Sequence, residues 1–389
     1  MRGLACAILS ISLLTVMAGA AMAPALGTIK DHFSQSSPML IQLIVSLPAL
    51  AIIVTTFLFR KLCGLMRTRS LALLGLSLYV VAGAGAFFVD NMGVLLFMRA
   101  LLGVSVGIVM PLSTGLLSFY FPPQEQSRLM GLSAAMNQMG GVVATMLAGI
   151  FAIIEWRYAF LVYLAGLLAV ILVAWFLPNE RLENPRQEAI VRRYSFSRLL
   201  ARFHPSVTAM LFIMLVFFVY PTNFALTAHT QGFDAMTLTL IMVGLDAVAF
   251  VVGLLFGRLM NFLRRQMKYI APLGFLVGYA CLASVPGLAG MIMGSIFIGV
   301  ANGVGVPYVN TIASIKGGRQ SAVTVMPLIS ASLYLGQFLS PLIVSPISTC
   351  IGTPTAPYGV AIVLSLLFLI QVFLTRHHHA LPPPQTSKS

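Results

Sequence analysis

The chain carries twelve long apolar runs separated by short polar segments. A helix needs about 20 residues to cross the hydrocarbon core of a bilayer. Backbone groups in lipid must hydrogen-bond internally, and runs of this length suit helices rather than the alternating strands of a membrane β-barrel. The runs are residues 4–26, 38–59, 71–89, 93–117, 128–153, 156–177, 206–229, 236–257, 268–286, 288–313, 321–347 and 356–375. The sequence therefore predicts an all-α membrane protein with twelve transmembrane helices.

The scarcity of charge agrees with this prediction. Of the 389 residues, 59% are hydrophobic and only 8% are charged, whereas a soluble domain is about 25% charged. A soluble fold of this length could not cover its surface with so few charged side chains.

The net charge of +14 is explained by where the basic residues lie. If both termini are on one side of the membrane, that side holds all of the 23 Lys and Arg residues except Lys30 and Arg157, on the other side, and Arg99, within a span. Acidic residues show no such bias, and a bias of Lys and Arg alone is the positive-inside rule. We therefore expect a multi-pass protein of the cell (inner, cytoplasmic) membrane with both termini cytoplasmic. Its surroundings are the lipid bilayer, and no nucleic-acid partner is implied.

The polar segment 178–205 divides the chain nearly in half. We predict an N-terminal six-helix half over 1–177, a cytoplasmic linker over 178–205 and a C-terminal six-helix half over 206–376. A disordered cytoplasmic tail is predicted over 377–389. The linker includes an amphipathic piece, around 190–203, that is expected to lie on the membrane surface.

The two halves repeat each other. Gly103, Gly107 and Pro111 recur 196 positions later, and Pro24 recurs as Pro221. Parallel halves related by an axis along the membrane normal are a transporter architecture. The start of the chain imitates a secretory signal, but the repeat gives its first helix a counterpart, so we expect that helix to be retained.

One stretch of motifs resembles a known family. Arg99 begins the sequence RALLGVSVG, the hinge FPPQEQSRLMGL follows it, and WRYAF begins at Trp156. These motifs, together with the six-plus-six pattern, are similar to the major facilitator superfamily, and most like its drug/proton antiporter branch. The resemblance implies the major facilitator fold, two pseudo-symmetric halves that rock to give alternating access, and a monomer. Two features depart from that branch: Gly64 stands where the loop motif has an aspartate, and the fifth helix lacks a Gly-Pro pair.

Two charged residues in the spans are candidates for proton coupling, because charge is costly in a membrane. Asp246 is the only carboxylate within a predicted span, and a low dielectric disfavours the charged form of a carboxylate, as proton exchange requires. Arg99 is expected to be a cavity charge that either modulates proton coupling or binds an anionic group. For both residues a structural role remains open: a paired aspartate, and an arginine that donates to backbone carbonyls.

Other polar residues in the spans are expected to line a substrate cavity, although each is also suited to bonding neighbouring helices. The candidates are Tyr220, Asn223, His229, Asn137, Gln138, Asn302, Tyr334 and Gln337. The small-residue ridges and the basic loops are expected to form the conformational hinge or gate, and we place it at Gly103, Gly107, Pro111, Gly299, Gly303, Pro307, Arg67 and Arg264.

No enzyme site is predicted. The spans carry no nucleophile–base or metal constellation, the four cysteines form no C-x-x-C pair, and no Walker motif is present. The tract His377–His379 could bind a metal, but in a proline-rich tail it is more often incidental.

The chain is therefore interpreted as a secondary active transporter of a small molecule. It needs no cofactor and uses the proton gradient. Proton-coupled export of amphipathic or drug-like molecules is favoured by the resemblance. The alternative is proton-coupled uptake of a small organic acid or other nutrient.

Overall fold

The computed structural model describes residues 2–180, 196–263, 266–317 and 325–375. In these residues twelve helical segments are long and apolar enough to cross a membrane, which confirms the predicted number of spans. Most observed segments begin within a few residues of the predicted ones, whereas the seventh begins at Leu199 rather than at 206. The fold is all-α, as predicted: no strand is assigned in the described ranges.

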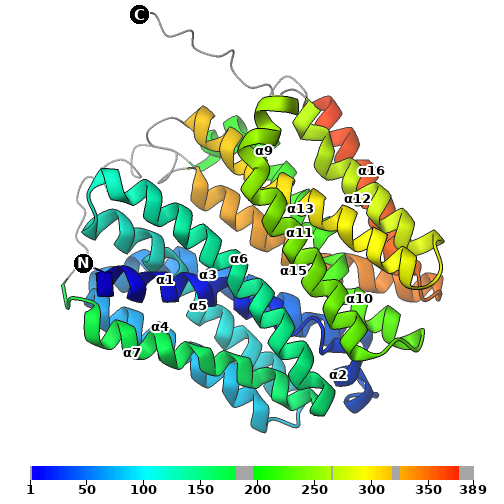
Figure 1. Cartoon of the computed structure of the whole chain (residues 1–389), viewed down its shortest axis with the longest axis horizontal. Coiled ribbons are helices and arrows are strands. Elements are labelled where there is room, and N and C mark those ends of the chain that lie inside the picture. Colours follow the sequence, from blue (N-terminus) through cyan, green and yellow to red (C-terminus); the bar gives the residue numbers. More distant parts are fainter. Residues whose placement is uncertain (1, 181–195, 264–265, 318–324, 376–389) are drawn as a thin grey trace, which may run out of the picture.

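The helices form two groups, one on each side of the molecule (Figure 1). The first group, the N half, contains α1 (Arg2–Ala20), α2 (Leu26–His32), α3 (Pro38–Leu65), α4 (Thr68–Ala84), η1 (Gly85–Phe88), α5 (Met92–Tyr120), α6 (Pro123–Ile154), η2 (Trp156–Ala165) and α7 (Gly166–Phe176). The second group, the C half, contains α9 (Phe196–Phe217), α10 (Val219–Thr230), α11 (Ala235–Leu263), α12 (Met267–Ser284), α13 (Gly287–Gly317), α15 (Met326–Ile351) and α16 (Ala356–Leu374).

Equivalent contacts stabilise the packing inside each half. The hydroxyl of Tyr79 donates to the Leu14 carbonyl over 3.1 Å, and the hydroxyl of Tyr279 donates to the Val216 carbonyl over 2.6 Å. A methyl group at Gly140 would lie 2.0 Å from the carbonyl oxygen of Leu13, and one at Gly336 would lie 2.6 Å from that of Leu211. The repeat found in the sequence is therefore a repeat of helix packing.

The first spanning helix of each half is interrupted near its proline. α1 ends at Ala20, and α2 begins at Leu26, just after Pro24. In the C half the break lies at Phe218, between α9 and α10 and three residues before Pro221. Proline cannot donate a backbone hydrogen bond, so it leaves carbonyls of the preceding turn without a helical partner.

The helix that follows the predicted linker begins earlier than the predicted span. The linker is predicted to continue to Pro205, with an amphipathic piece around 190–203 on the membrane surface. Instead α9 begins at Phe196 and continues through Pro205 into the span, so this amphipathic stretch is the first part of a membrane helix. Residues 190–195 lie outside the described ranges.

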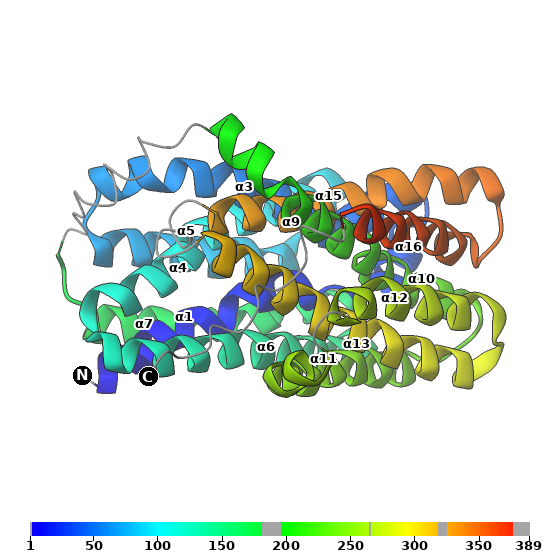
Figure 2. The ribbon, with the colours of Figure 1, turned by 90° about the horizontal axis from the view of Figure 1, so that it is seen from above.

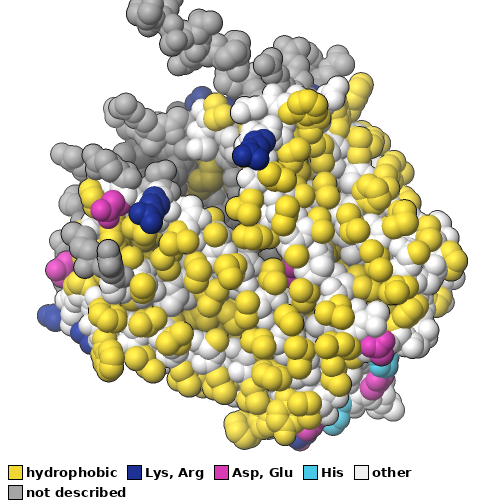
Figure 3. Space-filling model, viewed as in Figure 1, with side chains coloured by type: hydrophobic (Ala, Val, Ile, Leu, Met, Phe, Trp, Pro, Cys, Tyr) yellow, Lys and Arg dark blue, Asp and Glu magenta, His cyan; other side chains and the backbone are white. Residues whose placement is uncertain are grey.

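The outer surface is apolar along the helices and charged at their ends. Large side chains such as Phe57, Trp175 and Phe262 are 66%, 78% and 85% exposed, as expected for side chains that face lipid. Figure 3 shows most of the Lys and Arg side chains towards one end of this apolar face and the His side chains towards the other, with Asp and Glu side chains at both ends. We call the end that holds the α3–α4 junction the basic end, and the end that holds the α4–α5 junction the opposite end.

The two halves meet along helix pairs from each side. α3 packs against α15, α6 packs against α11, and α10 contacts α2 and α3. Figure 2 shows α3 and α15 along one side of the molecule and α6 and α11 along the other. Any site between the halves lies between these two pairs.

Candidate transport site between the two halves

Arg99 is fully buried inside the N half, and the backbone satisfies its guanidinium. Its Nε donates to the carbonyl of Ile44 over 2.8 Å, and one terminal nitrogen donates to the carbonyl of Ala18 over 2.8 Å. The other terminal nitrogen donates to the hydroxyl of Tyr163 over 2.7 Å. Both backbone acceptors are free for a local reason: Pro48 has no N–H to offer Ile44, and Ala18 lies in the last turn of α1.

This geometry favours the structural interpretation of Arg99. The guanidinium joins α1, α3 and η2, and none of its three nitrogen atoms is left aimed at the space between the halves. An anion binding there would have to break hydrogen bonds that Arg99 already makes.

Asp246 lies where the two halves touch. It belongs to α11, it is partly exposed, and its Oδ2 accepts a hydrogen bond from the hydroxyl of Thr145 on α6 over 3.0 Å. Tyr220 of α10 is close enough to Asp246 to interact with it electrostatically. The only carboxylate predicted within a span is therefore hydrogen-bonded across the boundary between the halves.

The same pair of helices also approaches closely about one turn further along α6, towards the opposite end. A methyl group at Gly149 of α6 would lie 2.2 Å from the side-chain atoms of Thr239 on α11. The absence of a side chain at Gly149 is what allows this approach.

Two further contacts close the opposite end. The Gln42 amide on α3 donates from Nε2 to Oδ1 of Asn223 on α10 over 2.8 Å, and both side chains are 3% exposed. His229 of α10 faces Asp31 of α2, with Nε2 and Oδ2 3.2 Å apart. His229, which was expected in the cavity, is 36% exposed and lies at the opposite end of the molecule instead.

Tyr334 and Gln337 share one face of α15, and sulfur atoms are their hydrogen-bond acceptors. The hydroxyl of Tyr334 lies 2.9 Å from Sδ of Met110 in the N half, and Nε2 of Gln337 lies 3.7 Å from Sδ of Met214 on α9. Thioether sulfur is a weak acceptor. Both side chains are also partly exposed. Their hydrogen bonds therefore hold them only weakly in place.

Comparison with known proteins decides the family. A family model described as the Major Facilitator Superfamily matches residues 6–341. The chain belongs to the Major Facilitator Superfamily. It is a multi-pass membrane transporter and not an enzyme.

Individual relatives of this transporter are distant. It is 24% identical over 322 residues to the quinolone resistance protein NorA of Staphylococcus aureus. This match covers 79% of this chain and 80% of the relative. It is 27% identical over 127 residues to the multidrug transporter protein MdtP of Bacillus subtilis, covering 32% of this chain and 24% of that one.

Solved structures share its fold. A bacterial homologue of the human lysosomal transporter Spinster, in an inward-facing and unoccupied conformation, superposes with a TM-score of 0.76 at 14% identity, over 98% of each chain. A D-xylose–proton symporter also gives a TM-score of 0.76 at 14% identity, over 94% of this chain and 97% of the other.

The remaining cavity candidates of this transporter are mostly held by neighbouring helices. Tyr220 shares a hydrogen bond of 2.7 Å with Ser295, and Asn137 accepts one of 2.6 Å from Thr15. Gln138 is exposed. Asn302 differs, because its side-chain oxygen is buried with no hydrogen-bond partner in the described parts of the chain.

The residues expected at the hinge or gate pack within the halves. Methyl groups at Gly103 and Gly107 of α5 would lie 2.3 Å from Pro48 O and 2.6 Å from Thr55 Cβ on α3. Methyl groups at Gly299 and Gly303 of α13 would lie 2.8 Å and 2.6 Å from backbone oxygens of α11. The other proposed members are Pro111 and Pro307, both inside these helices, Arg67, exposed at the start of α4, and Arg264, which lies outside the described residues.

The structure adds residues that the sequence analysis missed. Gln42, Thr145 and Tyr163 each hold one of the candidate residues. Gln42 had a usable signal, because a glutamine within a span is as costly as the asparagines that were chosen. Thr145 had none, because threonine commonly bonds its own helix.

No metal site is evident where the structure can be described: no group of three His, Cys, Asp or Glu side chains could hold an ion. The tract His377–His379 and the predicted tail lie outside the described ranges.

Proposed function

We propose that this transporter exports small amphipathic or drug-like molecules in exchange for protons, with Asp246 as the proton carrier. The observation that carries the proposal is the hydrogen bond from Thr145 to Asp246, which joins the two halves at 3.0 Å. Alternating access requires the halves to separate and close again on opposite sides. A carboxylate at this contact can link its protonation to that movement.

The link follows from the strength of the hydrogen bond. A bond to an ionised carboxylate is roughly twice as strong as one between neutral groups. Protonation of Asp246 therefore weakens the α6–α11 contact. We propose that the loss of this contact favours opening at the opposite end, and that release of the proton favours closure.

The proposed binding region lies around Tyr334 and Gln337. Their weak bonds to Met110 and Met214 leave a hydroxyl and an amide that a substrate can take over at little cost. Methionine side chains are flexible and polarizable, so they adapt to ligands of different shape. The names of NorA and MdtP, which refer to quinolone resistance and multidrug transport, agree with a drug-like substrate class.

Uptake of an organic acid is the weaker candidate. It needs a cation for the carboxylate, and the arginine considered for that task is sealed by Ile44, Ala18 and Tyr163. We propose further that the basic end is cytoplasmic, since Lys and Arg concentrate in the cytoplasmic loops of membrane proteins. The energy source is then the proton gradient, with no cofactor, and the working unit is the monomer.

The proposal is tested by proton flux in liposomes that contain the purified transporter and a trapped pH dye. A panel of lipophilic cations and organic acids is added outside, and the native protein is compared with Asp246→Asn. Asp234→Asn is the matched control, because Asp234 directly precedes the same helix and is exposed. Hydrogen bonds from the Thr237 side chain and backbone lower the pKa of Asp234, and asparagine can cap α11 equally well.

We expect a substrate-dependent proton flux, opposite in direction to the substrate, in the native protein and in Asp234→Asn. The flux should disappear in Asp246→Asn. Undiminished flux in Asp246→Asn would rule out the carrier role. A proton that moves in the same direction as an organic acid would show uptake rather than export.

A further inference from the structure

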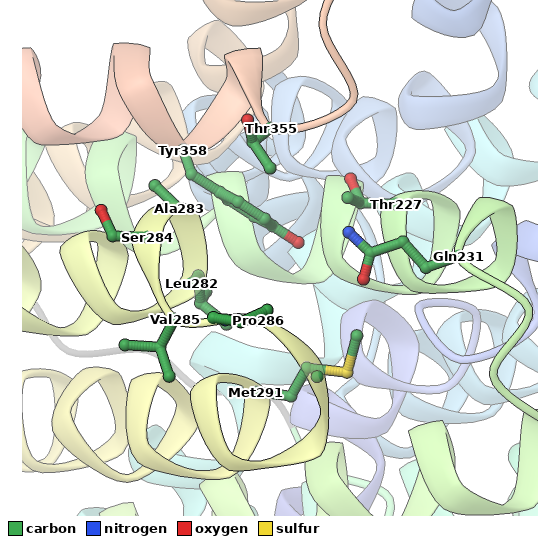
Figure 4. A pocket seen from close by; sticks show the side chains of 11 residues that line it. Thr227, Gln231, Leu282, Ala283, Ser284, Val285, Pro286, Met291, Thr355 and Tyr358 are labelled. Atoms are coloured by element: carbon green, nitrogen blue, oxygen red, sulfur yellow. The ribbon is translucent and has the colours of Figure 1, made fainter.

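A small cavity lies at the opposite end of the C half, away from the α6–α11 contact. Its volume is about 200 Å³, and it lies between the end of α10, the turn from α12 to α13 and the start of α16 (Figure 4). The functional argument above does not use it. Its eleven lining residues include no charged side chain.

The equivalent place in the N half is filled. There the end of α2, the junction of α4 and α5 and the start of η2 come together, and three aromatic side chains occupy the space. The ring of Trp156 lies 5.0 Å from the ring of His32 and 5.4 Å from that of Phe33, and His32 lies 3.5 Å from Asp90 at the junction. The C half therefore leaves open a space that its pseudo-symmetric partner fills with aromatic rings.

The cavity has a polar side and an apolar side. In Figure 4 the hydroxyl of Tyr358 points towards Thr227 and Gln231, while Leu282, Pro286 and Met291 lie on the other side. Tyr358 and Thr227 are 3% and 7% exposed, whereas Gln231 is exposed at the mouth. An occupant can therefore enter beside Gln231 and place its polar group against the Tyr358 hydroxyl.

The size of the cavity limits the occupant to one ring. A dry cavity of about 150 Å³ is known to hold a benzene molecule, so about 200 Å³ leaves room for one polar substituent. We propose that this cavity is a binding site for a neutral, single-ring aromatic molecule with a hydrogen-bonding substituent, such as a phenol. The absence of charge in the lining disfavours ionic ligands, because a charged group there would be left without a partner.

Occupancy would act on α10. This helix is separated from α9 at Phe218, and its side chains Asn223 and His229 make contacts that close the opposite end. A ligand between α10, α16 and the α12–α13 turn holds α10 in the position seen here. Binding therefore stabilises the closed opposite end. The binding itself does not depend on the proposed export function.

The test uses p-cresol and the full-length transporter in lipid nanodiscs, with binding followed by saturation-transfer NMR. Thr355→Trp places an indole at the start of α16, as Trp156 does at the start of η2, and should fill the cavity. Ala283→Phe fills it from the end of α12 and guards against a misplaced indole. Thr355→Ser is the matched control, and Tyr358→Phe removes only the hydroxyl.

We expect saturable binding in the native protein and in Thr355→Ser, and its loss in both filling variants. Tyr358→Phe should weaken binding about fivefold, the effect of one lost hydrogen bond. An equal signal in all variants would mean that p-cresol only partitions into lipid, and would overturn the proposal. Binding that survives in Thr355→Trp and in Ala283→Phe while both proteins remain folded would also overturn it.

Discussion

At the scale of single residues, Arg99 shows how backbone carbonyls and a hydroxyl can accommodate a charge buried in a membrane protein. Its guanidinium donates hydrogen bonds to two backbone carbonyls and one tyrosine hydroxyl. The end of α1, and the missing N–H of Pro48 within α3, make those carbonyls available. The burial of the arginine therefore depends on these two local features of the backbone.

We predict that Arg99→Met lowers the stability of the fold by about 2 to 4 kcal/mol, because three hydrogen bonds from a charged donor are lost and the Ile44 carbonyl is left unpaired. The Ala18 carbonyl keeps the hydrogen bond that it accepts from the Tyr163 hydroxyl over 3.1 Å. Arg99→Lys should lose somewhat less, since an ammonium cannot reach all three acceptors in the fork geometry of a guanidinium. Thermal unfolding in detergent measures both. Native-like melting temperatures combined with altered ligand binding would instead identify Arg99 as a cavity charge.

At the scale of helices, the glycines have two different tasks. Gly140 and Gly336 let helices approach within one half, whereas Gly149 lets α6 approach α11 in the other half. Contacts of the first kind persist through a rocking movement of rigid halves. Contacts of the second kind must break when the opposite end opens.

Gly149→Ala should therefore shift the conformational equilibrium towards opening at the opposite end, because its methyl group would collide with Thr239. Gly131→Ala, in the same helix, is the matched control, since a methyl group there meets nothing within 4 Å. Spin labels at Ser34→Cys and Thr353→Cys, in a background without the native cysteines, report the distance between the halves. An unchanged distance distribution in Gly149→Ala would show that the halves do not meet tightly at this point.

The helices were predictable from the sequence because span length and hydrophobicity are local properties. The breaks near Pro24 and Pro221 have a local cause too, since proline acts on its own turn. The partners of the polar residues were not visible. Whether Asp246 meets Thr145, or Arg99 meets Ile44, depends on how helices far apart in the sequence cross. The same holds for His229, because its position in the helix gives no indication of its contact with Asp31.

At the scale of the whole molecule, closure of the opposite end combines buried and exposed contacts. Gln42 and Asn223 are almost completely buried, and Oε1 of Gln42 has no hydrogen-bond partner in the described part of the chain. Asp31 and His229 are 62% and 36% exposed. Water screens the exposed pair, and pairs of this kind contribute about 0 to 1 kcal/mol. The buried amide pair should therefore control closure.

Asn223→Leu should open the opposite end, because it leaves the buried Gln42 amide with no partner. An unpaired buried amide costs about 2 kcal/mol, which shifts the equilibrium between closed and open forms about thirtyfold. The double variant Gln42→Leu with Asn223→Leu should restore closure, since two apolar side chains leave no polar group unpaired. Asp31→Asn should shift the equilibrium less than fivefold, by the weakness of exposed pairs. The spin-label distance between Ser34→Cys and Thr353→Cys measures all three. If the double variant were as open as Asn223→Leu alone, closure would depend on a specific amide contact rather than on the cost of an unpaired one.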